Sequence, residues 1–177
     1  MNPRLPAEWE AQDGVLLAWP HEGTDWAYMM DDVRPVFVEI IRHITRFERV
    51  LLTAPDAASA ECFLADGGVD LSRVTVCEMP NNDTWARDFG PLTVIYNNQP
   101  VLLDFGFNGW GLKFPANHDN LISKRLKEQG DPRMFGKMDY FDQFPYADKK
   151  RGLYEREMAK DKHKSKANQE KTSEGDE

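Results

Sequence analysis

Apolar residues recur at helical spacing between residues 31 and 47, and this is the strongest pattern in the chain. The recurring positions are Val33, Val36, Phe37, Ile40, Ile41, Ile44 and Phe47. This spacing predicts one apolar face of an amphipathic helix. Asp31 and Asp32 are expected to cap its N-terminus, with Pro35 in the first turn, where its missing N–H costs little.

Short apolar runs on either side of this helix predict strands. Residues 15–19 lie between a Gly and a Pro, and residues 49–54 follow the helix directly. A second helix follows, which Asp56 is placed to cap. Alternation of Val74 and Val76 then marks another strand. The order is that of successive strand–helix–strand units.

A hairpin is expected next in the chain. Residues 92–96 and 101–105 are apolar and flank the turn-forming sequence at 97–100. Leu121, Ile122 and Leu126 then indicate a helix near residues 118–129. Repeated β-α-β units with an added hairpin predict the α/β fold class.

The chain has 177 residues, of which 41% are hydrophobic, and a formal net charge of −8. One domain with a true core is expected, or at most two small ones. Neither a signal peptide nor an apolar run of about 18 residues is found, so a cytoplasmic location without a membrane partner is expected. The acidic balance argues against nucleic-acid binding and favours a small cationic ligand.

The C-terminal part shows little periodicity in its apolar residues. No element is predicted for residues 131–157. Residues 158–177 contain five Lys, five acidic side chains and few apolar ones, which predicts a disordered charged tail. A charged helix end before Asn168 is the alternative for the first half of this tail.

Cys62 and Cys77 are the two cysteines in the chain. They provide no disulfide framework and have neither the spacing nor the His partners of a zinc site, so we expect no metal and no cofactor. Cys62 falls in the second predicted helix and Cys77 at a strand end. Both are expected to be small buried thiols without reactivity.

Polar and aromatic side chains are concentrated in two loops. Residues 80–91 hold two carboxylates, an Arg, a Trp and two Asn, and residues 104–114 combine four Gly or Asn with four aromatic residues. Such density in a connecting segment indicates a binding site. The alternative is a pair of surface loops in which the Trp residues pack on the domain and the acids cap turns.

Four motifs in this chain resemble one known family. They are RLPAEW at 4–9, LAWPH at 17–21, NDTWARDFGP at 82–91 and LDFGFNGWGLKF at 103–114. These motifs are similar to the N-terminal half of the agmatine deiminase and bacterial peptidyl-arginine deiminase family. The resemblance implies a pentein fold, a five-bladed α/β propeller, of which residues 1–130 would form the first two to three ββαβ-type blades. It also implies hydrolysis of agmatine to N-carbamoylputrescine and ammonia, with a peptidyl C-terminal arginine as the alternative substrate.

The resemblance further implies roles for three residues. Asp88, in the W-x-R-D motif, would bind the guanidinium, since a carboxylate can accept two parallel N–H bonds from this planar cation. Trp85 would line the substrate channel, where an aromatic face favours a cation. Trp110 is a further candidate for the wall, and a core anchor is its alternative role.

Three neighbouring residues are expected to support the site. Arg87 would form a structural ion pair, because a catalytic cation would repel a cationic substrate. Asn82 and Asp83 would shape the turn through side-chain-to-backbone hydrogen bonds.

The nucleophile of this family has no counterpart here. The family places its Cys in G-C-G-N-x-H-C, a His in H-x-D and a Glu in E-G-G, and none of these motifs occurs in the sequence. We therefore expect a truncated member that is inactive alone. The alternatives are a half-propeller module that associates with itself or with a complementary half-chain, and a fragment without retained function.

Overall fold

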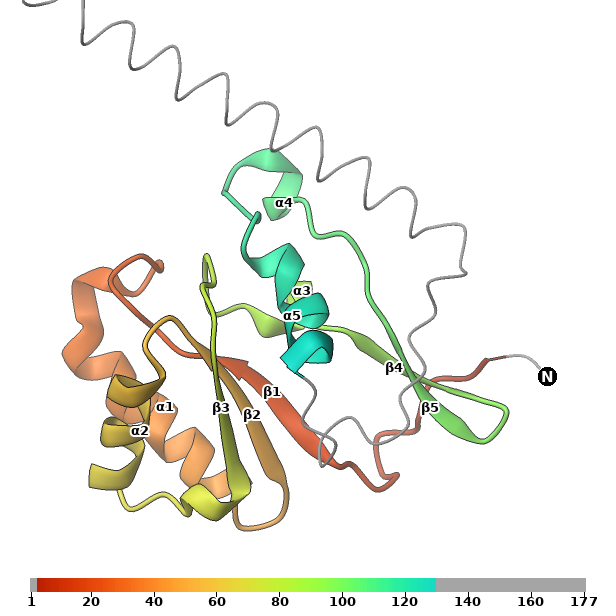
Figure 1. Cartoon of the computed structure of the whole chain (residues 1–177), viewed down its shortest axis with the longest axis horizontal. Coiled ribbons are helices and arrows are strands. Elements are labelled where there is room, and N and C mark those ends of the chain that lie inside the picture. The colour runs from red at the N-terminus through yellow and green to blue at the C-terminus, as the bar shows by residue number, and fades with distance from the viewer. Residues whose placement is uncertain (1–2, 130–177) are drawn as a thin grey trace, which may run out of the picture. The chain divides into compact units, whose positions relative to one another are not determined.

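The computed structural model describes residues 3–129 (Figure 1), so the predictions for 131–157 and 158–177 lie outside the described residues. A parallel three-stranded sheet is formed by β1 (Gly14–Ala18), β2 (Arg49–Ala54) and β3 (Val74–Glu78), with β2 in the centre. Parallel neighbours require crossover connections, and helices supply them as the sequence predicts.

Two helices cover one face of this sheet (Figure 1). They are α1 (Met30–Ile44) and α2 (Ala57–Asp66), which connect β1 to β2 and β2 to β3. The buried residues of this layer are Trp19, Val38, Ile41, Val50, Leu52, Ala54, Ala60, Leu64 and Val69. The predicted cap of α2 is confirmed, since Asp56 Oδ1 accepts a hydrogen bond of 2.8 Å from Ser59 N.

The start of α1 differs from the prediction. Met29 is the N-cap residue and provides no side-chain hydrogen bond, while Asp31 and Asp32 lie within the first turn. The two carboxylates thus interact favourably with the positive end of the helix dipole and do not cap the helix. Pro35 is the sixth residue of α1, beyond the first turn, so the helix lacks the hydrogen bond that residue 35 would donate to Asp31.

The apolar face of α1 is also rotated from the expected one. Val36 and Ile40 are exposed, and Val38 is buried in their place. Phe47 follows the end of the helix and is 75% exposed. The apolar pattern is wider than the strip that the sheet covers, which is why spacing alone did not separate core from surface positions.

The opposite face of the sheet is covered by α3 (Ala86–Phe89) and α5 (Ile122–Gln129), the latter preceded by a 3₁₀ turn at Asp119–Leu121. The core residues on this side are Ala18, Leu51, Cys77, Met79, Phe89, Ile122 and Leu126. The helix expected near 118–129 is therefore confirmed. Further single turns lie at Ala27–Met29, Leu71–Arg73 and α4 (Gly109–Leu112).

The predicted hairpin is present with a tighter turn. The strands are β4 (Leu92–Tyr96) and β5 (Gln99–Leu103), so the turn has two residues instead of four. Asn97 and Asn98 have φ angles of 51° and 60°, which match the type I′ turns that suit hairpins. Pro100, assigned to the turn from its residue type, lies in β5 opposite Ile95.

The described residues form a mixed α/β structure, with α1 and α2 on one face of the sheet and α3 and α5 on the other. The N-terminal segment joins the hairpin, since Arg4 and Ile95 exchange backbone hydrogen bonds of 2.8 and 3.1 Å. Among residues 3–129, no helix has the length and apolar character needed to cross a membrane.

Candidate functional site

The polar loop at residues 80–91 is fixed to the segment before α5 by two reciprocal side chains. Asn82 Oδ1 accepts hydrogen bonds from the backbone N–H groups of His118 (2.7 Å) and Asp119 (3.1 Å). Asp119 Oδ1 accepts in return from the N–H groups of Asn82 (2.7 Å) and Asp83 (3.4 Å). Asn82 was expected to shape its own turn, but it connects two segments instead, because the backbone donors within its reach belong to residues 118 and 119.

Asp119 is a supporting residue that the sequence did not reveal. It is 2% exposed. Burial raises the pKa of its carboxyl group to about 6; the N–H groups of Asn82 and Asp83 oppose the rise, and the charge of Asp83 adds to it. Spacing in the segment around it indicates only a helix, and a helix-starting acid gives no sign of a partner 37 positions away.

Asp83 organises the residues that follow it. Its Oδ1 accepts a hydrogen bond of 2.8 Å from Thr84 N, as predicted for a turn-shaping acid, and its Oδ2 accepts one of 3.1 Å from Trp85 Nε1. Burial raises the pKa of Asp83; the Thr84 N–H opposes this shift and the nearby Asp25 charge adds to it. The Asp83 carboxylate therefore stabilises the turn of the loop and fixes the indole of Trp85.

Five aromatic residues from three segments of the chain form one aromatic cluster. Its members are Trp26, Trp85, Phe107, Trp110 and Phe114. The structure thus brings the two predicted wall residues together: the ring centroids of Trp85 and Trp110 lie 6.4 Å apart with an interplanar angle of 86°. Trp85 is 43% exposed and Trp110 is 39% exposed, so neither is a buried core anchor.

Asp88 lies in the same helical turn as Trp85. Trp85 is the N-cap residue of α3, and the backbone N–H of Asp88 donates to its carbonyl oxygen at 2.9 Å. Asp88 and Arg87 are both exposed. Within residues 3–129, neither side chain has a hydrogen-bond or ion-pair partner, so the ion pair expected for Arg87 is not formed there.

The two thiols lie in different environments. Cys77 is buried in the core on the α3 and α5 side, as expected. Cys62 is exposed, contrary to the prediction, because α2 turns Ala60 and Leu64 toward the sheet and leaves position 62 on the outer side. In the part of the chain that the structure describes, no group of three or more His, Cys, Asp or Glu could hold a metal ion.

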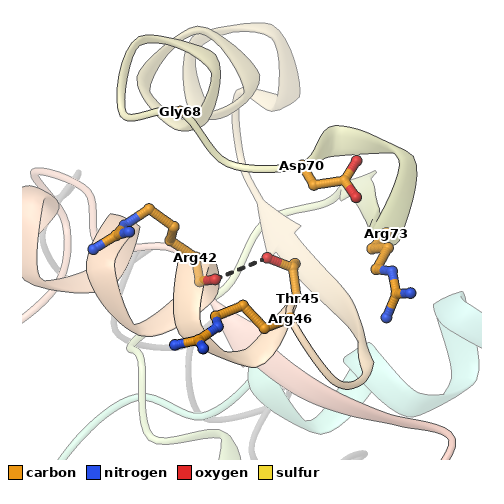
Figure 2. Close-up of a pocket in the computed structure, with 6 residues that line it drawn as sticks. All are labelled: Arg42, Thr45, Arg46, Gly68, Asp70 and Arg73. Carbon is orange, nitrogen blue, oxygen red and sulfur yellow. Dashed lines mark hydrogen bonds between the residues drawn. The ribbon is translucent and has the colours of Figure 1, made fainter.

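A basic hollow of about 350 Å³ lies elsewhere, between the C-terminal end of α1 and the segment after α2 (Figure 2). Its lining includes Arg42, Arg46 and Arg73. Arg42 is paired with Glu39, and the Arg46 guanidinium lies 5.4 Å from the ring centroid of Phe47. Three arginines and one carboxylate, Asp70, line the hollow, so its net charge is positive and disfavours a cationic ligand.

Several known proteins are similar to this chain in sequence and in fold. A solved structure from Porphyromonas gingivalis, provisionally named an arginine deiminase, is 43% identical with a TM-score of 0.64, and the match covers 73% of this chain and 38% of that one. An agmatine deiminase variant from C. jejuni, solved with substrate bound, is 30% identical with a TM-score of 0.67, covering 80% and 40%.

An agmatine deiminase of Pseudomonas aeruginosa is 30% identical over 131 residues, which are 71% of this chain and 35% of the relative. The chain thus spans about a third of the length of the curated relatives that it matches. The family model described as Porphyromonas-type peptidyl-arginine deiminase matches residues 4–140. The chain belongs to this family, as its four sequence motifs indicated, and its α/β fold is that of the agmatine and peptidyl-arginine deiminases.

Proposed function

We propose that this chain carries the guanidinium-binding side of a deiminase-family active site, with Asp88 and Trp85 as the main contacts to a cationic guanidine such as agmatine. One observation carries this proposal. Asp88 is an exposed carboxylate without a partner among the described residues, and it lies in the same helical turn as a half-exposed Trp.

The neighbouring acids are less suited to this role. Asp83 uses both carboxylate oxygens for Thr84 and Trp85, and Asp119 is buried beneath the loop. Asp88 can offer both oxygens to two parallel N–H groups of a guanidinium, which fixes the orientation and the charge of the ligand. Trp85 and Trp110, which are 43% and 39% exposed, would add an aromatic attraction to the cation and cover its apolar chain.

Agmatine is the substrate of first choice, because agmatine deiminases are among the relatives and are named so in several solved structures. One observation favours the alternative, a peptide that ends in arginine. Arg87 is exposed beside Asp88 and is not paired within residues 3–129, so it could bind the terminal carboxylate of such a peptide.

Binding without turnover is the activity we propose for this chain by itself. Attack on the guanidinium carbon requires a thiolate. Cys77 is buried, and Cys62 lies on the outer side of α2, on the sheet face opposite α3. Turnover would then need catalytic groups from outside this sequence, for example from a complementary chain.

Calorimetric titration of agmatine into the 177-residue protein tests the proposal. Asp88→Asn should raise the Kd at least tenfold, because a hydrogen bond to a charged group contributes about 1.5–3 kcal/mol. Asp66→Asn is the matched control, since Asp66 is an exposed acid at the end of α2. Equal affinity of the Asp88 variant and the wild type would refute the assignment.

A second titration separates the two substrates. A short peptide with a C-terminal arginine is compared with its amidated form, in the wild type and in Arg87→Gln. Preference for the free carboxylate that is lost in Arg87→Gln would favour the peptide. Tighter binding of agmatine than of either peptide would favour agmatine.

A further inference from the structure

Trp85 is held by contacts from its own loop and from two segments that are far away in the sequence. Its indole N–H donates to Asp83 Oδ2 at 3.1 Å. The ring of Trp26 lies 6.2 Å away at an interplanar angle of 32°, and Trp110 meets Trp85 edge to face. A side chain that is 43% exposed is therefore restrained on several sides.

Trp26 is tied to the same loop by a hydrogen bond of its own. Its indole N–H donates to Thr84 Oγ1 at 2.9 Å, and the Thr84 backbone N–H donates to Asp83 Oδ1 at 2.8 Å. Hydrogen bonds thus connect Trp26 to Thr84, Thr84 to Asp83 and Asp83 to Trp85. The contact between the two indole rings connects Trp85 back to Trp26. Both indole N–H groups are used, and the exposed part of the Trp85 ring remains available to a ligand.

We propose that Trp26, Asp83 and Thr84 are positioning residues that hold the Trp85 ring in one orientation before a guanidinium binds at Asp88. This inference rests on the proposed function. An aromatic ring attracts a cation through its face, so its orientation determines the strength of the contact. A ring already fixed in the free protein loses less rotamer freedom on binding, which improves affinity.

Thr84 allows a sharp test, because one conservative variant removes its hydroxyl and another keeps it. Thr84→Val keeps the shape and removes the hydroxyl that accepts from Trp26, whereas Thr84→Ser keeps the hydroxyl. Thr93→Val is the control for the Thr-to-Val change, since Thr93 lies in β4. Trp26→Phe retains an aromatic ring next to Trp85 and removes the indole N–H together with the pyrrole part of the ring.

Two readouts are combined. The indole N–H resonances of Trp26 and Trp85, assigned through Trp→Phe variants, report the local structure in the free protein. Thr84→Val and Trp26→Phe should move the Trp85 resonance and speed its hydrogen exchange. They should also weaken agmatine binding about three- to tenfold, whereas Thr84→Ser and Thr93→Val stay within twofold of the wild type.

The possible failures are distinguishable. Lack of agmatine binding by the wild type refutes the proposed function itself. If the wild type binds and Asp88→Asn does not, but Thr84→Val and Trp26→Phe bind like the wild type, then the positioning role alone is refuted. An unchanged Trp85 resonance in both variants also refutes it, and well-dispersed amide spectra establish that each variant is folded.

Discussion

Asn82 and Asp119 each accept hydrogen bonds from backbone N–H groups at the other's position, and this exchange joins the loop of the candidate site to the 3₁₀ turn before α5. Four backbone donors depend on two side-chain oxygens. A buried donor without an acceptor costs free energy, and this exchange removes that cost from both segments at once. The position of the loop that bears Asp88 thus depends on residues more than 30 positions later in the chain.

Replacement of Asn82 by Ala should destabilise the fold substantially. The variant leaves the N–H groups of His118 and Asp119 without their acceptor, for a loss of about 2 kcal/mol in the free energy of unfolding. Urea denaturation measures this loss. Asn117→Ala is the control, because it removes only the acceptor of the Asn82 amide and should cost less than half as much.

The two side chains should also be energetically coupled. In a double-mutant cycle of Asn82→Ala and Asp119→Ala, each change disrupts the same junction, so the double variant should lose less than the sum of the single losses. We expect a coupling of about 1 kcal/mol. Strict additivity would mean that the two halves of the exchange act independently.

The stability of the protein should depend on pH through Asp119. Burial raises the pKa of this carboxyl group from its ordinary value of 3.8 to about 6, so the folded state disfavours the ionised form. Stability from this group is present below pH 4 and is lost as the pH rises through 6. Relative to a variant that does not titrate, the wild type should lose up to about 3 kcal/mol between pH 4 and 7.

Asp119→Asn is that variant, because both backbone donors bind the same oxygen, Oδ1, which an amide retains. Urea denaturation of the two proteins across this pH range gives the difference in the free energy of unfolding. The contributions of groups that titrate in both proteins largely cancel in this difference. A difference that stays constant from pH 4 to 7 would contradict the raised pKa.

Much of the fold could be predicted because its signals are local. The Asp56 cap, the strand at residues 49–54 and the hairpin each depend on neighbours within a few positions. The orientation of α1 could not be predicted, since Val36 and Val38 are equally apolar and only the sheet decides which one is buried.

The site was predictable in its residue types but not in its connections. Residues Asp88, Trp85 and Trp110 were identified through family resemblance, and the structure places the two Trp rings in contact. Trp26 and Asp119 were missed because their partners, Thr84 and Asn82, lie 58 and 37 positions away. No local pattern marks a hydrogen bond over such a separation.

The turn around Trp110 should tolerate Ala at one of its two glycines and not at the other. Gly109 and Gly111 both have positive φ angles, of 58° and 83°. An added Cβ at Gly109 would clash with the carbonyl oxygen of Phe114, whereas at Gly111 it would meet nothing within 4 Å. Gly111→Ala should cost about 1 kcal/mol, the strain of a left-handed residue, and Gly109→Ala clearly more. Thermal denaturation gives the order, and equal losses would contradict the close approach to Phe114.

The hairpin turn offers a stabilising substitution. Asn98 has a φ angle of 60°, at the second central position of a two-residue turn where Gly is preferred. Asn98→Gly should therefore raise the free energy of unfolding by about 0.5 kcal/mol, as measured by urea denaturation. Asn98→Val is the opposing control and should destabilise the protein, since a β-branched residue is strained at this angle. A loss of stability in Asn98→Gly would contradict the type I′ geometry.

The two cysteines should differ in reactivity, and neither should support catalysis. Cys62 is exposed and should react rapidly with a thiol reagent, whereas Cys77 is buried and should react only when the protein unfolds. Cys62→Ser should leave agmatine affinity unchanged, because Cys62 lies on the side of α2 that faces away from the sheet. An assay for ammonia should detect no turnover in the wild type or in this variant. Ammonia release that either Cys62→Ser or Cys77→Ser abolishes would show that this chain contains its own nucleophile.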